Sequence, residues 1–277
     1  MRKIRILKVI SSFLIIICIS IGDGRSVEVK HMSKINTSKV IITIIYDNTS
    51  YQENIKSGWG FSCLIQGPEK TILFDTGGED LLLMRNLKKL EIDPKIVDII
   101  FLSHIHKDHT GGLTHFLDLN PDVTIFLPQS FPKSFTDQID KYGAQVIEVH
   151  GVMDICNDVY TTGELGESIK EQSLVIKTTR GSIIITGCAH PGIVHIVKEV
   201  TTITQENVFL LFGGFHLRDY SQNEIEQISD QLKKMGVQHI GPTHCTGELA
   251  RGVFKDQFSK NYIELGAGKQ IILEELE

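Results

Sequence analysis

The sequence predicts one globular domain of mixed helices and strands, of the α/β or α+β class. The first reason is size and composition: 277 residues, of which 41% are hydrophobic, suffice to bury one large core. The second is a series of short β-branched runs, such as 40–46 and 182–186, which are typical of buried strands. The third is a set of segments with apolar residues every three or four positions, such as 225–235, which indicate amphipathic helices.

The first 22 residues differ in character from the rest of the chain. Four basic residues lie among the first eight, and residues 9–21 form a 13-residue apolar stretch. A membrane span needs about 20 apolar residues, so this pattern favours a secretory signal. We therefore expect residues 1–22 to be a signal peptide or N-terminal anchor, and the protein to be exported to the periplasm or the extracellular space. A signal peptide would contact the membrane transiently, whereas an anchor would stay in it through residues 9–21. Lipidation at Cys18 and a buried N-terminal strand are the alternatives.

Residues 23–39, rich in Gly, Ser, Lys, Asn and Thr, are expected to be a linker, and residues 40–277 to form the domain. The first half of the domain is expected to be rich in strands. The expected strands are 40–46, 60–66, 71–75, 96–102, 123–127 and 145–149, and the expected helices are 79–90 and 113–119. The segment 131–142 is expected to be helical or mobile, and it is a candidate cover for a binding site.

Strands and helices alternate in the second half of the domain. The expected strands are 174–178, 182–186, 208–212 and 239–241. A helix is expected after each of the last three. Pro191 suits the first turn of one helix, because its missing N–H costs nothing there. Ser221 and Glu224 form a capping box for the next, which Gly236 ends, and Val253 lies on the apolar face of the third.

The strand 96–102 leads into a loop with three histidines and one aspartate within six residues: His104, His106, Asp108 and His109. A loop can direct the first two imidazoles to one side and the last two groups to another. A helix could not, because neighbours on one helix face are three or four residues apart. Imidazole and carboxylate together suit zinc and similar transition metals, and the offset between the two pairs indicates two metals side by side. The alternative is a polar loop with incidental histidines.

Three later strands also end in Gly-rich loops that carry a histidine. The loops are Gly187-Cys-Ala-His190-Pro-Gly, Gly213-Gly-Phe-His216 and Pro242-Thr-His244-Cys-Thr-Gly. Loops at strand ends are where α/β folds build their sites. We therefore expect these histidines to lie near the loop 103–112.

These four motifs together resemble the metal-binding motifs of the metallo-β-lactamase superfamily. The three later motifs are similar to those of a branch that includes archaeal dihydropterin-methyl-ribofuranosylaminobenzene-phosphate synthases and related metal-dependent hydrolases. The resemblance covers roughly residues 40–275. It implies the metallo-β-lactamase fold, an α+β architecture in which an αββα sandwich of two mixed sheets is flanked by helices.

The resemblance also implies a dinuclear metal site and its ligands. His104, His106 and His190 would hold one divalent metal ion, and Asp108, His109 and His244 would hold the other. Zinc (Zn2+) is favoured, because di-iron relatives carry Glu where this chain has His106; Mn2+ and Fe2+ are the alternatives. Asp75, which ends the strand 71–75, is implied to lie under the metal loop and hold a ligand, with a plain turn as the other interpretation.

Two cysteines beside the expected ligands have roles that the sequence leaves open. Many superfamily members carry a bridging Asp after Thr-Gly, where this chain has Cys188. Its thiolate could bind zinc, or it could be a bystander behind the ligands. Cys245 follows His244, and in an exported protein Cys188 and Cys245 could form a disulfide that controls the site.

The implied activity is that of a metal-dependent hydrolase acting on a small-molecule substrate that is polar and of ester or phosphoester type. Two cations about 3.5–4 Å apart would lower the pKa of a shared water, so that metal-bound hydroxide is available at neutral pH. Asp108 would orient the hydroxide by accepting its proton. His216 would donate to the developing negative charge or line the pocket; a core histidine is the alternative.

Two other functions stay open. One is the pterin synthase activity of the branch, although an exported protein would not meet its cytosolic substrate. The other is a catalytically silent, metal-bound sensor, which the complete ligand set disfavours. Nucleic-acid binding is not expected, because the net charge is −6 and no basic stretch carries interleaved aromatic residues. The sequence does not indicate the oligomeric state.

Overall fold

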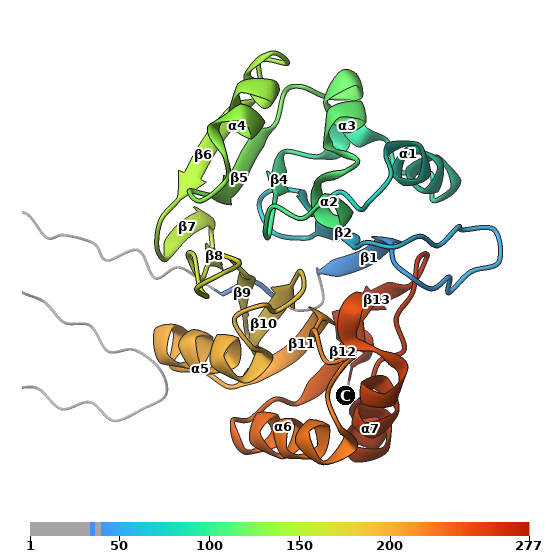
Figure 1. Cartoon of the computed structure of the whole chain (residues 1–277), viewed down its shortest axis with the longest axis vertical. Helices are drawn as coiled ribbons and strands as arrows, with labels where there is room; N and C mark the ends of the chain where they lie inside the picture. Colours follow the sequence, from blue (N-terminus) through green and yellow to red (C-terminus); the bar gives the residue numbers. More distant parts are fainter. Residues whose placement is uncertain (1–33, 37–39, 277) are drawn as a thin grey trace, which may run out of the picture. The chain divides into compact units, whose positions relative to one another are not determined.

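The computed structural model describes residues 34–36 and 40–276 (Figure 1). Contacts divide the chain into two units, Met1–Ser33 and Lys34–Glu277, and the described residues all belong to the second. The predicted signal peptide or anchor, residues 1–22, lies outside the described residues, as does most of the predicted linker. Within the described part of the chain, no helix is both long and apolar enough to cross a membrane.

The first sheet has seven strands in the order β13-β1-β2-β3-β4-β5-β6. Its strands are β1 (Ile41–Tyr46), β2 (Ser62–Gln66), β3 (Ile72–Phe74), β4 (Ile99–Phe101), β5 (Thr124–Pro128), β6 (Gln145–Val149) and β13 (Gln270–Ile272). Pairing is antiparallel from β13 to β3 and parallel from β3 to β6, so the sheet is mixed.

The second sheet has six strands in the order β12-β11-β10-β9-β8-β7. Its strands are β7 (Met153–Cys156), β8 (Val159–Thr161), β9 (Leu174–Thr178), β10 (Gly181–Thr186), β11 (Val208–Gly214) and β12 (His239–Thr243). Pairing is antiparallel from β7 to β10 and parallel from β10 to β12, so this sheet is mixed as well. The loops after the three parallel strands therefore leave the sheet at one edge.

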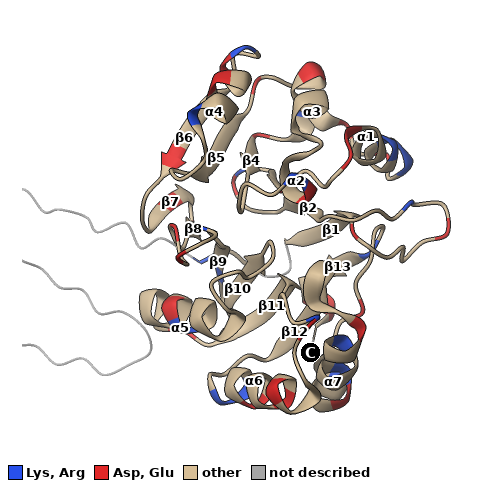
Figure 2. Cartoon of the chain, in the orientation of Figure 1, with Lys and Arg blue, Asp and Glu red and all other residues tan. Residues whose placement is uncertain are grey.

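Helices cover the outer face of each sheet (Figure 1). The first half contains α1 (Asp80–Lys89), α2 (Lys107–Thr110), α3 (Leu113–Leu119) and α4 (Lys133–Asp140), and the second contains α5 (Ile193–Thr204), α6 (Gln222–Lys234) and α7 (Glu248–Phe258). Short 3-10 helices are η2 (Pro94–Ile96), η3 (His244–Thr246), η4 (Ser259–Asn261) and η5 (Leu273–Glu275). Figure 2 marks both acidic and basic residues on α4, α6 and α7, as expected of helices with a solvated face.

The core sits in three layers because the central strands are apolar on both faces. In β10, Ile183 and Ile185 belong to the cluster between the sheets, whereas Ile184 belongs to the cluster under α5 and α6. This alternation is the two-residue period of a strand. Phe74 and Phe101 of the first sheet stack in the central layer, with ring centroids 5.4 Å apart. The expected αββα sandwich of two mixed sheets is thus confirmed.

Most predicted elements are confirmed to within a few residues, and the capping box of Ser221 and Glu224 is present. The segment 131–142 is helical, and Ile139 of α4 packs in the cluster on the outer face of the first sheet. Sequence patterns did not predict β7, β8 or β13. These strands are three or four residues long, and in β7 no side chain is fully buried, so the hydrophobic pattern was too weak to mark them.

Candidate metal centre

The four histidine-bearing loops meet where the two sheets adjoin. The loop after β4 belongs to the first sheet, and the loops after β10, β11 and β12 belong to the second. The ring centroid of His104 lies 4.9 Å from that of His190, and the ring centroid of His109 lies 4.9 Å from that of His244. The site is therefore built by both halves of the sandwich, as the strand-end motifs indicated.

The first donor cluster consists of His104, His106 and His190, whose ligand atoms lie within 4.8 Å of one another. His104 Nε2 lies 3.1 Å from His106 Nδ1. The Nε2 atom of His190 is buried and has no hydrogen-bond partner within the described residues. Burial and the neighbouring histidines lower the pKa of His104 well below its usual value and that of His190 to about 4. The rings are thus neutral at pH 7, which is the form that binds metal.

The second donor cluster consists of Asp108, His109, Cys188 and His244, again with ligand atoms within 4.8 Å. His109 Nε2 lies 3.2 Å from His244 Nε2 and 3.3 Å from Cys188 Sγ. Asp108 Oδ2 lies 3.3 Å from His244 Nε2. Although burial opposes it, the hydrogen bond from His244 and the two histidines hold the pKa of Asp108 below its usual range. Cys188 Sγ thus lies among the possible ligand atoms of this cluster, a position that the sequence left open.

The residues of both clusters fit divalent metal ions. Ring nitrogens lie 3.1–3.2 Å apart in each cluster, and the Nε2 atom of His190, a member of the first cluster, is buried without a hydrogen-bond partner in the described part of the chain. A cation at the centre of each cluster would satisfy these lone pairs without any proton between them. The clusters are adjacent, since the ring centroids of His104 and His109 are only 4.2 Å apart.

Asp75 lies beneath the loop that carries the first ligands and is fully buried. Its Oδ2 accepts from His109 Nδ1 at 2.6 Å and from the Ser103 hydroxyl at 2.7 Å, and its Oδ1 accepts from the Ser103 amide at 2.7 Å. Ser103 Oγ in turn lies 2.9 Å from His104 Nδ1. One carboxylate therefore orients a histidine in each donor cluster, which fixes the ring nitrogen that faces the metal.

We expect Asp75→Asn to weaken zinc binding by roughly 10- to 100-fold while the chain stays folded. Asparagine has the same shape, but an NH2 group replaces one of the two carboxylate oxygens. Either the His109 Nδ1–H or the Ser103 amide N–H therefore loses its acceptor. The measurement is a zinc titration against a chromophoric chelator. Asp93→Asn is the matched control, because Asp93 is the exposed N-cap of the 3-10 helix η2 and belongs to neither donor cluster. Unchanged zinc affinity in Asp75→Asn would contradict the orienting role.

Glu171 was not found from the sequence, yet it shapes the site. Its fully buried carboxylate accepts four backbone N–H bonds, at 2.8–3.0 Å, from Gly187, Cys188, Ala189 and His190. Burial raises the pKa of Glu171 to about 7, and the four N–H donors oppose that shift. No local motif marks this residue, because all its partners lie 16 to 19 positions later in the chain.

Asp47 and Asn48, after β1, hold the loop of His244 and were also missed. Asp47 accepts from the Thr243 hydroxyl and from the His244 amide, and Asn48 Oδ1 lies 3.0 Å from His244 Nδ1.

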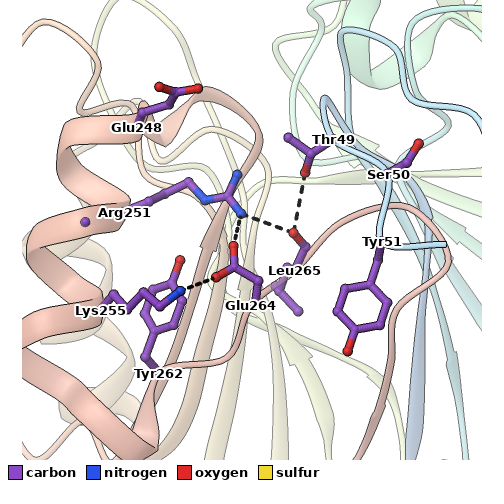
Figure 3. A pocket seen from close by; sticks show the side chains of 10 residues that line it. Thr49, Ser50, Tyr51, Glu248, Arg251, Lys255, Tyr262, Glu264 and Leu265 are labelled. Atoms are coloured by element: carbon purple, nitrogen blue, oxygen red, sulfur yellow. Dashed lines mark hydrogen bonds and ion pairs between the residues drawn. The ribbon is translucent and has the colours of Figure 1, made fainter. Parts of the chain in front are cut away.

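A cavity of about 370 Å³ opens on this side of the domain (Figure 3). In it, Arg251 donates to Glu264 at 2.8 Å and to the Leu265 carbonyl at 3.2 Å. None of the donor residues lines that cavity, so it is separate from the metal centre.

His216 is exposed beside the first donor cluster, with its ring centroid 4.5 Å from that of His190. The donor atoms of His216, Cys188 and Cys245 also lie within 4.8 Å of one another. A hydrogen bond that His216 donates to the Cys245 sulfur raises the pKa of His216. Both cysteines are free thiols in this structure, so the hypothetical disulfide between them is not formed here.

Several residues of the site have left-handed backbone conformations. The φ angle is +52° at Asp75, +59° at Ala189, +53° at His216 and +49° at His244. Residues with a Cβ rarely adopt this region, and such strain concentrates at functional sites. The buried carboxylates of Glu171 and Asp47 accept from the backbone N–H groups of Ala189 and His244 and so hold two of these residues in place.

Trp59 and Arg218 lie beside the second donor cluster. The ring of Trp59, the single tryptophan of the chain, has its centroid 5.1 Å from that of His244 and is half exposed. The guanidinium carbon of Arg218 lies 4.5 Å from the centroid of the Trp59 ring. Within the described residues, Arg218 has no carboxylate partner. Its charge is therefore available to a negatively charged ligand at the site.

Comparison with known proteins agrees with this geometry. A model of the metallo-beta-lactamase superfamily matches residues 60–197. The chain is 32% identical to the 7,8-dihydropterin-6-methyl-4-(β-D-ribofuranosyl)-aminobenzene-5'-phosphate synthase of Methanocaldococcus jannaschii, over 87% of this chain and 98% of that protein. It is 29% identical to the uncharacterized protein MJ0448 of the same organism, over 75% of this chain and 91% of that protein.

Solved structures show the same fold. Tm1679, described as a metal-dependent hydrolase of the β-lactamase superfamily, superposes with a TM-score of 0.71 at 28% identity, covering 84% of this chain and 98% of that one. The metallo-β-lactamase-fold protein YhfI from Bacillus subtilis superposes with a TM-score of 0.63 at 15% identity, covering 84% of this chain and 99% of that one. The near full-length match to the synthase, the superfamily model and the fold together show that the chain belongs to the metallo-β-lactamase superfamily.

Proposed function

We propose that the chain is a metal-dependent hydrolase that acts, with two divalent metal ions, on a small polar substrate of ester or phosphoester type. The observation that carries the proposal is the pair of adjacent donor clusters, His104/His106/His190 and Asp108/His109/Cys188/His244. Proteins of this superfamily typically bind divalent metals. When bound, two such ions would supply a water-derived nucleophile at neutral pH and neutralise charge on the substrate oxygens.

Zinc is the metal we favour. The possible donors are imidazole nitrogens, one carboxylate and one cysteine sulfur that would bind as a thiolate, a set that suits zinc better than magnesium or calcium, which prefer oxygen ligands. Mn2+ and Fe2+ remain the alternatives. Cys188 is the donor that most strongly favours zinc, since thiolates are soft ligands.

Three residues in or beside the donor clusters have distinct proposed roles. The ionised carboxylate of Asp108 would accept a proton from the attacking water, because it lies beside His244 and faces the cluster. His216, exposed beside His190, would donate a hydrogen bond or proton to the leaving side of the substrate. Arg218, stacked on Trp59 without a carboxylate partner, would attract an anionic group of the substrate.

The synthase reaction is the second candidate. The identity of 32% to the Methanocaldococcus synthase, over nearly the full length of both proteins, supports it directly. The N-terminal pattern argues the other way, because export through a signal peptide at residues 1–22 would separate the protein from a cytosolic substrate. An intact Met1 on protein isolated from the cytosol of its own host would contradict export and favour the synthase.

Metal content per chain tests the proposal. We expect about two equivalents of zinc in the wild type, losses in His190→Ala and Asp108→Ala, and no loss in His216→Ala. Each of the first two substitutions removes one donor from a different cluster, whereas His216 stands outside both sets of proposed ligands. The measurement is elemental analysis of the full chain after dialysis against buffered zinc.

The same proteins can then be assayed with a panel of phosphodiester, lactone and thioester substrates. One equivalent or none in the wild type would contradict the two-metal centre and require a mechanism around a single metal. Two equivalents without hydrolysis of any substrate in the panel would contradict the hydrolase and favour the synthase or a metal-bound sensor.

A further inference from the structure

A cavity of about 300 Å³ adjoins the first donor cluster and has no role in the chemistry described so far. It lies between the start of α5, the loop after β11 and the middle of α6. His190 and His216 line one side of it. The other walls come mainly from Ile193, Val194, Phe215, Leu217, Tyr220 and Ile228. Its size and its largely apolar lining match the ligand pockets of small-molecule enzymes.

The polarity of the lining restricts what the cavity can hold. None of the described residues that line it is Asp, Glu, Lys or Arg. Apart from the two histidines, the polar side chains are the phenol of Tyr220 and the amide of Gln231. A cationic group would lose its hydration there without gaining a partner of opposite charge, and an anionic group would find only the imidazoles of His190 and His216. The occupant is therefore uncharged and mainly apolar.

The walls favour a ring over a flexible chain. Two aromatic side chains, Phe215 and Tyr220, and the two imidazoles present flat faces or edges to the cavity. Aromatic groups pack on such surfaces by offset stacking or edge-to-face contact. The side-chain amide of Gln231 offers one donor and one acceptor, which suits the polar edge of a heterocyclic ring.

The position of the cavity connects it to the reacting centre. His190 belongs both to the first donor cluster and to the cavity wall, and the His216 ring lies 4.5 Å from it. A ring held here would lie beside the metal centre, because His190 is shared by the cavity wall and the first donor cluster. Val194 on α5 and Ile228 on α6 are half-buried on the walls, so larger side chains at these positions would fill the space.

We propose that this cavity is a specificity subsite that binds an uncharged ring of the substrate next to the bond that reacts. The assignment of the reacting bond rests on the proposed function. The substrate class thereby narrows to esters or phosphoesters in which the ester group lies directly beside an aromatic or heteroaromatic ring.

Phosphonates test the subsite without any turnover. We would measure binding of phenylphosphonate, butylphosphonate and methylphosphonate to the zinc-loaded full chain by isothermal titration calorimetry. Phenylphosphonate is expected to bind about tenfold more tightly than methylphosphonate, because its ring leaves water for an apolar wall, and more tightly than butylphosphonate. In Ile228→Trp the ratio of phenyl to methyl affinity should fall to about one, with methylphosphonate binding unchanged. Val194→Trp, from the opposite wall, should act in the same way and serves if Ile228→Trp fails to fold.

Ile203→Trp is the matched control, since Ile203 is on α5, is exposed and does not line the cavity. This variant should keep the wild-type ratio of phenylphosphonate to methylphosphonate affinity. Equal binding of phenyl- and methylphosphonate to the wild type would overturn the subsite while leaving the proposed function standing, and tighter binding of butylphosphonate would overturn the ring in favour of an acyl chain. The expected ratio in a protein that hydrolyses no ester would support the subsite and contradict the hydrolase.

Discussion

Asp108→Asn is expected to lower kcat for hydrolysis by about a thousandfold, which is within the range that a positioned proton acceptor contributes. Asparagine preserves the shape of the side chain but removes its charge. In the wild type, Asp108 Oδ2 lies 3.3 Å from His244 Nε2 and 3.8 Å from His109 Nε2, so it lies among the possible ligand atoms of the second donor cluster. An amide in this place can accept a hydrogen bond but cannot take a proton from water.

The assay compares kcat and KM for the best substrate of the panel with the zinc content of the same samples. Zinc content separates the two roles of the carboxylate: a variant that keeps both equivalents and loses kcat has lost the proton acceptor. Asp118→Asn, an exposed position on α3, controls for the change of charge. Wild-type kcat in Asp108→Asn at full zinc occupancy would exclude a catalytic role for this carboxylate.

Glu171→Ala is expected to lower the free energy of unfolding by roughly 3 kcal/mol or more in the metal-free protein. The substitution leaves the backbone N–H groups of residues 187–190 without their acceptor in a buried place. Each unpaired buried donor costs about 1–3 kcal/mol, and water entering the space left by the side chain would recover only a part of that. Zinc binding should weaken as well, because this segment carries both Cys188 and His190.

Urea unfolding of metal-free wild type and variant measures the difference directly. Glu167→Ala, an exposed glutamate in the same connection, is the matched control and should stay within about 0.5 kcal/mol of the wild type. A loss below 1 kcal/mol in Glu171→Ala would mean that the four N–H groups find other acceptors, and Glu171 would then have no special part in holding the loop.

The sequence could predict those features that depend on neighbouring residues. Strands of β-branched residues, the capped helix that begins after Ser221 and the loop from His104 to His109 all have local patterns, and the structure contains them. The two layers of sheet were inferred from a resemblance, since no local pattern tells which strands pair. The convergence of His190 and His244 on the first loop followed from the rule that strand-end loops meet at a sheet edge.

Features that depend on distant contacts could not be predicted in the same way. Asp47 binds the loop of His244 across 197 positions of sequence, and an aspartate after a strand is usually only a turn former. Glu171 follows Glu164 and Glu167 in one polar connection, so neither spacing nor composition distinguishes it from surface glutamates. The sequence could not tell whether Cys188 binds metal or lies behind the ligands. The answer depends on whether its side chain points toward the other ligand atoms, which the position of β10 in the fold determines.

The division of the donors between the two sheets has a consequence for how the protein is made. Ligands from the loop after β4 leave the ribosome first, whereas His244 is translated 135 positions after His109. During synthesis the early ligands alone would hold a metal ion only loosely, and the complete centre would form after the second sheet has docked. The first sheet is itself complete only after β13 has been translated, because β13 pairs with β1. Stable metal capture would therefore report completion of both sheets, and truncated chains would be distinguishable by their failure to retain the metal.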